Sequence, residues 1–98
     1  MVNIVKVHRE LAELIPQFIQ NRNADIKSMK DALIPGDYEF IQRIGHGMKG
    51  AGGGFGFDVI TEIGAVIENA AKIKNLEGIE KGIEDLSVYM KNLEVVYE

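Results

Sequence analysis

The sequence predicts an all-α fold: an antiparallel four-helix bundle with a short N-terminal helix. Three observations lead to this prediction. Apolar residues recur at spacings of three and four along most of the chain, which is typical of amphipathic helices. Short breaker segments separate these stretches, and no strand-length alternation is flanked by hairpin turns. Helices joined by short connections pack most simply in an up-down-up-down order.

The composition fits one domain that covers residues 1–98. This length suffices for one core but not for two. The net charge of −4 argues against a nucleic-acid partner, because phosphate backbones bind basic surfaces. The absence of cysteine excludes a disulfide framework and a thiolate zinc site. No stretch is as apolar as a signal peptide or a membrane span, so we expect a cytoplasmic protein that works as a monomer and needs no membrane.

The first half of the chain contains two predicted helices around Pro16. After a lead-in at residues 1–7, a short helix over 8–15 runs into a longer one over 16–33, whose first turn tolerates the proline. The breaker Ile34-Pro35-Gly36-Asp37 ends this pair, and its aspartate is a good N-cap for the next helix.

The second half contains three predicted helices. The first begins near residue 38 and continues into the glycine-rich segment 45–56, because apolar positions keep a helical period through the glycines. The next covers 59–73, with Asp58 as its N-cap. The last covers 76–95 and carries a near-heptad apolar stripe.

The predicted helix over 59–73 has a polar side opposite its apolar stripe. Glu62, Glu68 and Lys72 lie on that side, which we expect to face solvent. Glu68 and Lys72 are four residues apart, the spacing of a favourable ion pair on a helix surface.

The glycine-rich segment places a histidine on a polar face. On a helical wheel, six residues fall on the same side as His46: Glu39, Gln42, Arg43, Lys49, Gly50 and Gly53. The opposite side holds the apolar positions Ile41, Ile44, Met48, Ala51 and Phe55. His46 is therefore expected to point to solvent, one turn from a lysine.

Glycines in a helix interior reduce stability, so their presence beside His46 calls for a reason. One physical reason is access to the imidazole, since Gly50 and Gly53 leave the turn after His46 free of side chains. A neutral imidazole is a competent nucleophile, and Lys49 offers a charge to an anion. A phosphoryl group carried on nitrogen suits all of these features.

These residues carry a resemblance to a known family. The run His46-Gly47-Met48-Lys49-Gly50-Ala51, followed by Phe55-Gly56, resembles the signature of histidine-containing phosphotransfer (HPt) domains. The resemblance continues through the following helix, ITEIGAVIENAAK, and covers roughly residues 10–95. Met48 stands where leucine is commoner, and the glycine run is richer than the pattern requires.

The resemblance implies a four-helix bundle in which His46 accepts a phosphoryl group from a receiver-domain aspartate and passes it on. By position, Lys49 would help to hold that group and Gly50 would leave room for it. The partners would be receiver domains of response regulators or hybrid histidine kinases. The family uses no cofactor or metal of its own, since the magnesium belongs to the receiver. Partner docking would use the surface around Gln42, Arg43 and Gly53.

Two other classes of function are open to the same residues. A non-catalytic helical adaptor could dock receivers or other signalling partners through the same face without chemistry. An enzyme with its own small-molecule substrate fits less well, because no acid, base and pocket converge. The segment from Gly45 to Gly50 matches G-x-G-x-x-G, but no predicted strand precedes it, which argues against a nucleotide site. His8 reads as an ordinary surface residue, and no metal-ligand spacing is present.

Overall fold

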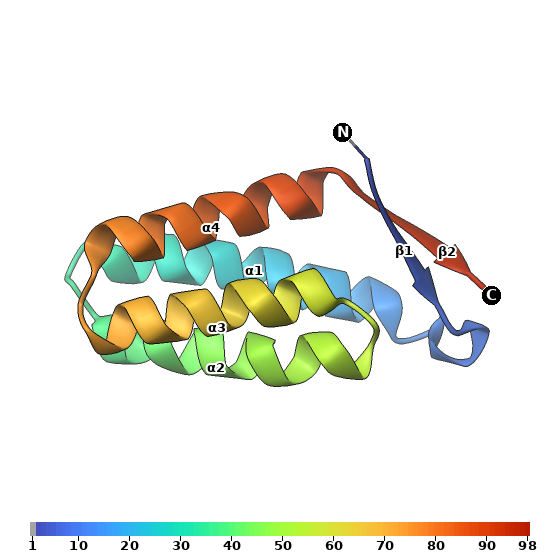
Figure 1. Ribbon diagram of the computed structural model, residues 1–98, viewed down its shortest axis with the longest axis horizontal. Helices are drawn as coiled ribbons and strands as arrows, with labels where there is room; N and C mark the ends of the chain where they lie inside the picture. The colour runs from blue at the N-terminus through green and yellow to red at the C-terminus, as the bar shows by residue number, and fades with distance from the viewer. Residues whose placement is uncertain (1) are drawn as a thin grey trace.

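Four α-helices make up most of the computed structural model, which describes residues 2–98 (Figure 1). This confirms the mostly helical fold. None of the helices in this part of the chain has the length and apolarity needed to cross a membrane. The elements in chain order are β1 Asn3–Val7, a 3₁₀ turn Arg9–Leu11, α1 Ile15–Leu33, α2 Tyr38–Gly54, α3 Asp58–Lys72, α4 Leu76–Lys91 and β2 Leu93–Tyr97.

The helix starts follow local signals in the sequence. Pro16 lies in the first turn of α1, where its missing N–H removes no helical hydrogen bond. The Asp37 side chain caps α2 by accepting from the Phe40 N–H at 3.1 Å, as predicted. Asp58 was expected as the N-cap of α3, but it is the first helical residue and Phe57 occupies the cap position. As an acid in the first turn, Asp58 still complements the helix dipole.

The short helix predicted over 8–15 is not what the chain forms there. Only the three-residue 3₁₀ turn Arg9–Leu11 precedes α1, and the Nδ1 atom of His8 caps it by accepting from the Glu10 N–H at 3.1 Å. A helix that continued from residue 8 into α1 would have the Pro16 ring against the preceding turn, with one hydrogen bond missing. The chain avoids this by starting a new helix at Ile15.

The prediction of a sheet-free fold was wrong. The lead-in forms β1, which pairs in parallel with β2, and Val5 lies opposite Val95 in the register (Figure 1). The last helix accordingly ends at Lys91 rather than at residue 95. The two strands are the two ends of the described chain, and the whole bundle forms the connection that a parallel pair requires. Each strand has only five residues, and the pattern within such a short stretch does not predict a pairing partner that is so distant in the sequence.

Helices α2 and α3 form the closest pair in the bundle. Their contacts follow reverse order, since Gly45 lies against Glu68 while Gly52 lies against Thr61. Helices α1 and α4 complete the four-helix bundle (Figure 1). The largest fully buried side chains are those of Val7, Ile15, Met29, Ile41, Met48, Phe57, Ile60, Ile67, Ile79 and Leu86.

An aromatic cluster closes the end of the bundle where α2 connects to α3. The Phe18 ring of α1 lies 4.8 Å from the ring centroids of both Phe55 and Phe57. Phe57 is fully buried and Phe55 is half-buried against the core. Aromatic pairs at this separation contribute beyond their buried area, so the cluster anchors the glycine-rich end of α2 to α1.

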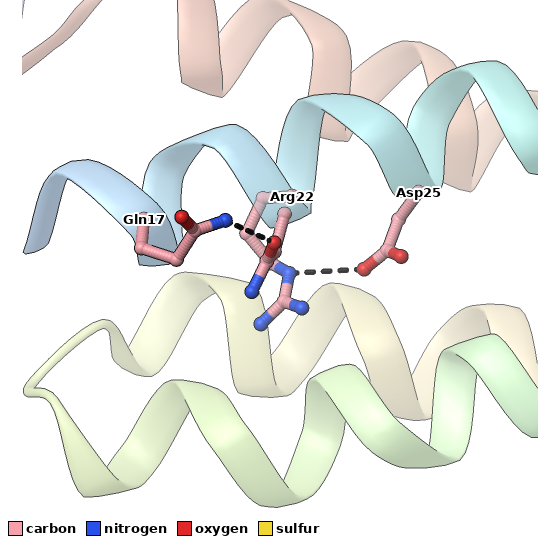
Figure 2. A network of polar contacts seen from close by, with 4 residues as sticks. Gln17, Arg22 and Asp25 are labelled. Carbon is pink, nitrogen blue, oxygen red and sulfur yellow. Dashed lines mark hydrogen bonds and ion pairs between the residues drawn. The ribbon is translucent and has the colours of Figure 1, made fainter. Parts of the chain in front are cut away.

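Polar side chains on α1 are bonded to one another within the helix (Figure 2). Arg22 Nε donates to Asp25 at 2.9 Å, and its guanidinium lies 4.9 Å from the centre of the Phe18 ring. Partial burial raises the pKa of Asp25, and the charge of Arg22 opposes that rise. The Gln17 amide donates to Asn21 at 2.9 Å. These interactions stabilise α1 itself and do not reach His46.

Candidate functional site

His46 lies on the solvent side of α2, and its side chain is 70% exposed. The helical period places it there because the opposite side of α2 carries the core residues. Ile41 and Met48 are fully buried, while Ile44, Ala51 and Phe55 are half-buried against the core. The predicted orientation of this helix is confirmed.

Glu68 of α3 holds both polar side chains of this face. Nδ1 of His46 lies 2.8 Å from Oε2 of Glu68, and Nζ of Lys49 lies 2.9 Å from Oε1 of the same carboxylate. The expectation that Glu68 is exposed and paired with Lys72 was wrong. Its side chain is only 8% exposed, because it lies on the flank of α3 that packs against α2.

Close packing of glycines brings Glu68 within reach of His46. A Cβ atom on Gly45 would lie 2.8 Å from the backbone nitrogen of Glu68, and one on Gly64 would lie 2.7 Å from that of Lys49. Real Cβ atoms are essentially never that close to backbone, so these positions require glycine. Gly52 repeats the arrangement further along α2, where a Cβ atom would lie 2.8 Å from the backbone nitrogen of Thr61.

The remaining glycines of α2 face solvent. Cβ atoms on Gly47, Gly50 and Gly54 would meet nothing within 4 Å, and one on Gly53 would meet only the Thr61 hydroxyl, at 3.6 Å. The helix therefore has two glycine faces, one for contact with α3 and one that leaves the surface beside His46 uncovered. Of the two predicted docking side chains, Arg43 is exposed and Gln42 is half-buried.

The hydrogen bond between His46 and Glu68 determines where the proton of the imidazole lies. Hydrogen bonds from Lys49 and from His46 hold the pKa of the Glu68 carboxyl below its ordinary value of 4.5. An ionised carboxylate only accepts hydrogen bonds, so the Nδ1 atom of His46 carries the proton and donates it. In the neutral ring the Nε2 atom then has a free lone pair. His46 therefore presents a nucleophilic nitrogen at the exposed edge of its ring.

Lys49 has a partner that the sequence did not predict. Its ammonium was expected to be available to an anion near His46, and it is instead paired with Glu68 while 43% of the side chain stays exposed. With a neutral imidazole, the lysine and the carboxylate cancel each other's charge. An anion that bound beside His46 would compete with Glu68 for this ammonium.

Sequence reasoning missed Glu68, although a signal was present. Gly64 and Ala71 flank Glu68 on one helical face, so a carboxylate lies in the middle of a stripe of small residues. The facing stripe on α2 is formed by Gly45 and Gly52. Stripes of small residues on two facing helices indicate that the helices approach closely. An acidic side chain within such a stripe can then reach the neighbouring helix.

The second histidine lies in another setting. His8 is exposed, and its Nδ1 atom accepts a backbone hydrogen bond in the 3₁₀ turn before α1. Within residues 2–98, no group of three or more His, Asp or Glu side chains is arranged to hold a metal ion. On the exposed face of α2, the polar contacts join His46 and Lys49 to Glu68.

Comparison with protein families adds independent information. The family model described as Hpt domain matches residues 13–95, which is most of the chain. The match includes α1 to α4 and all three side chains of the site. No curated protein and no solved structure matches the chain.

Proposed function

Because this chain belongs to the Hpt domain family, which carries phosphohistidine in phosphorelays, we propose that His46 is its phosphoryl-carrying residue. In this proposal His46 accepts a phosphoryl group from an aspartyl phosphate on a receiver domain and passes it to the aspartate of another. The chain then acts as a carrier, which takes up the phosphoryl group from one receiver and releases it to another.

The single observation that carries the proposal is the hydrogen bond from His46 Nδ1 to Glu68. It directs the proton to the inner nitrogen and leaves the Nε2 lone pair at the exposed edge of the ring. In the reaction, that lone pair attacks phosphorus, the bond from phosphorus to the aspartate oxygen breaks, and a P–N bond forms. The carboxylate leaves with the bonding electrons, so the step needs no other reagent.

The neighbouring residues support a role in holding and admitting the phosphoryl group. Lys49 lies on the same side of α2 as His46, and its flexible ammonium can turn from Glu68 toward a phosphoryl oxygen. Gly50 has no neighbour within 4 Å of a Cβ position, so the turn next to the imidazole is free of bulk. We propose Lys49 as the stabilising cation and Gly50 as the residue that permits access.

Docking of the receiver is proposed on the surface around the histidine. Members of the family interact with receiver domains. Gln42, Arg43 and Gly53 border His46 on α2, and we propose that they contact the receivers of response regulators or hybrid histidine kinases. The proposal takes the four helices as an antiparallel bundle, which the reverse order of contacts between α2 and α3 supports.

The test is transfer from a receiver that carries a labelled phosphoryl group. We expect the wild-type chain to take up label that is labile in acid and stable in base, as phosphohistidine is. His46→Gln should take up none. His8→Gln is the matched control, since it removes the other histidine and should retain the label.

Two results would contradict the proposal. Label that survives in His46→Gln would place the chemistry at another residue. A receiver that binds the wild type and His46→Ala equally, without uptake of label by either, would identify the chain as a non-catalytic adaptor.

A further inference from the structure

Strand β1 has a backbone edge that faces away from β2. In a parallel pair, successive residues of a strand point their N–H and C=O groups to opposite sides, so only alternate residues bond to the partner strand. The N–H of Asn3 donates to the Asn92 carbonyl at 2.7 Å, which shows that Asn3 points toward β2. Ile4 and Lys6 therefore point theirs away, and within residues 2–98 no hydrogen bond outside the sheet reaches these groups. Unpaired backbone groups on a strand edge are a template for another strand.

A groove of about 550 Å³ runs along this edge. It lies beside the sheet, at the end of the bundle where α2 connects to α3 (Figure 1). Its lining comes from β1, from the α2–α3 connection and from the neighbouring ends of α3 and α4: Ile4, Val5, Lys6, Gly56, Asp58, Val59 and Tyr89. The edge of β1 is therefore one wall of the groove, and the helical bundle provides the other.

The groove also presents side chains that are free to bind. In the part of the chain that the structure describes, neither Lys6 nor Asp58 forms an ion pair. Burial, followed by the negative charge of Asp58, raises the pKa of Tyr89, so its phenol stays protonated at neutral pH and can donate a hydrogen bond. Ile4 and Val59 add apolar surface, with 62% and 40% of each residue exposed.

We propose that this groove binds an extended peptide segment of a partner protein, which joins the sheet as a third strand beside β1. The peptide has apolar side chains that alternate with charged ones, and it carries a basic residue for Asp58 and an acidic residue for Lys6. This inference does not depend on the proposed function of His46.

The backbone groups identify an extended chain as the occupant. Ile4 and Lys6 lie about 7 Å apart along the strand, and an extended peptide repeats its own N–H and C=O groups at that interval. Gly56 marks one end of the pairing, since a Cβ atom there would lie 3.7 Å from the Lys6 carbonyl oxygen. A second copy of this chain would bring its whole bundle against α3 and α4, whereas a single extended segment is narrow enough for a groove.

The groove is separate from the exposed face around His46. Helix α2 continues for eight residues from His46 to its end at Gly54, which is about 12 Å of helix. The groove begins beyond that end, at Gly56. A peptide bound along β1 therefore leaves the imidazole uncovered, so that one partner can be held at the sheet while another approaches His46.

The test uses two capped pentapeptides, acetyl-Val-Lys-Val-Glu-Val-amide and its reverse, acetyl-Val-Glu-Val-Lys-Val-amide. Neither has a net charge, so attraction to the net charge of −4 on the chain does not drive binding. The order that binds more tightly gives the direction of the added strand. Amide hydrogen exchange of the nitrogen-15-labelled chain is followed by NMR as peptide is added up to millimolar concentration. The same peptides with methylated backbone nitrogens are the control probes.

We expect the amides of Ile4 and Lys6 to exchange rapidly in the free chain, while that of Val5, which points toward β2, is protected. The pentapeptide of the preferred order should protect the amides of Ile4 and Lys6, and its methylated form should not. The test fails for the proposal if neither order protects them, or if the methylated peptide binds equally well. Protection that grows with the concentration of the chain alone would identify a second copy as the occupant and overturn the peptide.

A pair of variants tests the edge from the side of the chain. Ile4→Pro removes the N–H that faces the groove and leaves the hydrogen bonds to β2 in place, a substitution that edge strands tolerate. It should weaken peptide binding about tenfold, the effect of one lost hydrogen bond. Ile4→Val keeps the N–H and should bind as the wild type does. Equal binding by all three chains would overturn the pairing.

The methylated peptide tests the same hydrogen bonds on the wild type should Ile4→Pro not fold. Phosphoryl uptake separates this proposal from the carrier function. Ile4→Pro should take up label from a phosphorylated receiver at the wild-type rate, because the substitution lies outside the face around His46. Loss of uptake in His46→Gln leaves peptide binding unchanged, so either proposal can fail while the other stands.

Discussion

Gly45 and Gly64 face each other so closely that a Cβ atom on Gly64 would lie 2.8 Å from the carbonyl oxygen of Gly45. This contact joins the helix that carries His46 to the helix that carries Glu68. It lies one residue from His46 along α2 and one turn from Glu68 along α3. The separation of the two helices at this point determines whether the carboxylate reaches the imidazole.

Replacing Gly64 by alanine should therefore destabilise the fold. The methyl group would lie 2.7 Å from the Lys49 backbone nitrogen, and the helices would have to separate. Overpacking of this kind costs about 1–3 kcal/mol. Urea unfolding measures the change. Gly47→Ala is the control, because its methyl group would meet nothing within 4 Å. That variant should be more stable than the wild type by up to about 1 kcal/mol. Equal effects at both positions would contradict the assigned packing.

The two histidines should show opposite tautomers when neutral. Nδ1 of His46 donates to Glu68, whereas Nδ1 of His8 accepts from the backbone N–H of Glu10 at 3.1 Å. The neutral proton should therefore lie on Nδ1 in His46 and on Nε2 in His8. Nitrogen-15 chemical shifts of the two rings distinguish these forms directly. A proton on Nε2 of His46 would remove the basis for nucleophilic attack by that atom.

Lys49→Ala should slow phosphoryl transfer while leaving His46 as the labelled residue. The substitution removes the cation proposed to stabilise the transferring group, and loss of one such interaction typically slows a reaction about a hundredfold. Rapid mixing with a phosphorylated receiver measures the rate. Lys72→Ala removes an exposed lysine from α3 and is the control. Unchanged transfer in Lys49→Ala would mean that the ammonium serves only to pair with Glu68.

Gly50→Leu should block transfer without unfolding the chain. Leucine is a better helix former than glycine, and a Cβ atom at this position has no neighbour within 4 Å. The added side chain would project beside His46, where the phosphoryl group and the receiver must approach. Circular dichroism verifies the fold, and the labelled-receiver assay measures uptake. Normal uptake would show that the clear surface beside His46 is not needed for access.

Stability should fall in acid partly because of Glu68. Its pKa in the folded chain lies below its ordinary value of 4.5, so the folded state binds this proton less readily than the unfolded state. The contribution of Glu68 is complete above 4.5 and is lost as the pH falls through the folded value. The difference in unfolding free energy between the wild type and Glu68→Gln should therefore shrink from about pH 6 to about pH 3. A constant difference would contradict the ionised, bonded carboxylate.

The helical elements could be predicted because their signals are local. Breakers and caps such as Pro35 and Asp37 act on adjacent residues, and apolar spacing sets which side of a helix is buried. The exposed orientation of His46 followed from the same spacing. The terminal sheet could not be found in this way, because Val5 and Val95 pair although they lie 90 residues apart in the sequence. Five-residue stretches carry little pattern of their own.

What the sequence by itself determined was the set of faces: a core face, and an exposed face with His46, Lys49 and Gly50. Only the tertiary structure decided which glycines leave a surface uncovered and which allow two helices to approach. It also showed that Glu68, which was expected to face solvent, lies beside His46. The physical reason is that helical periodicity describes one helix at a time. Whether a carboxylate meets solvent or an imidazole depends on the distance between two helices, which is set by the contact of Gly45 with Gly64.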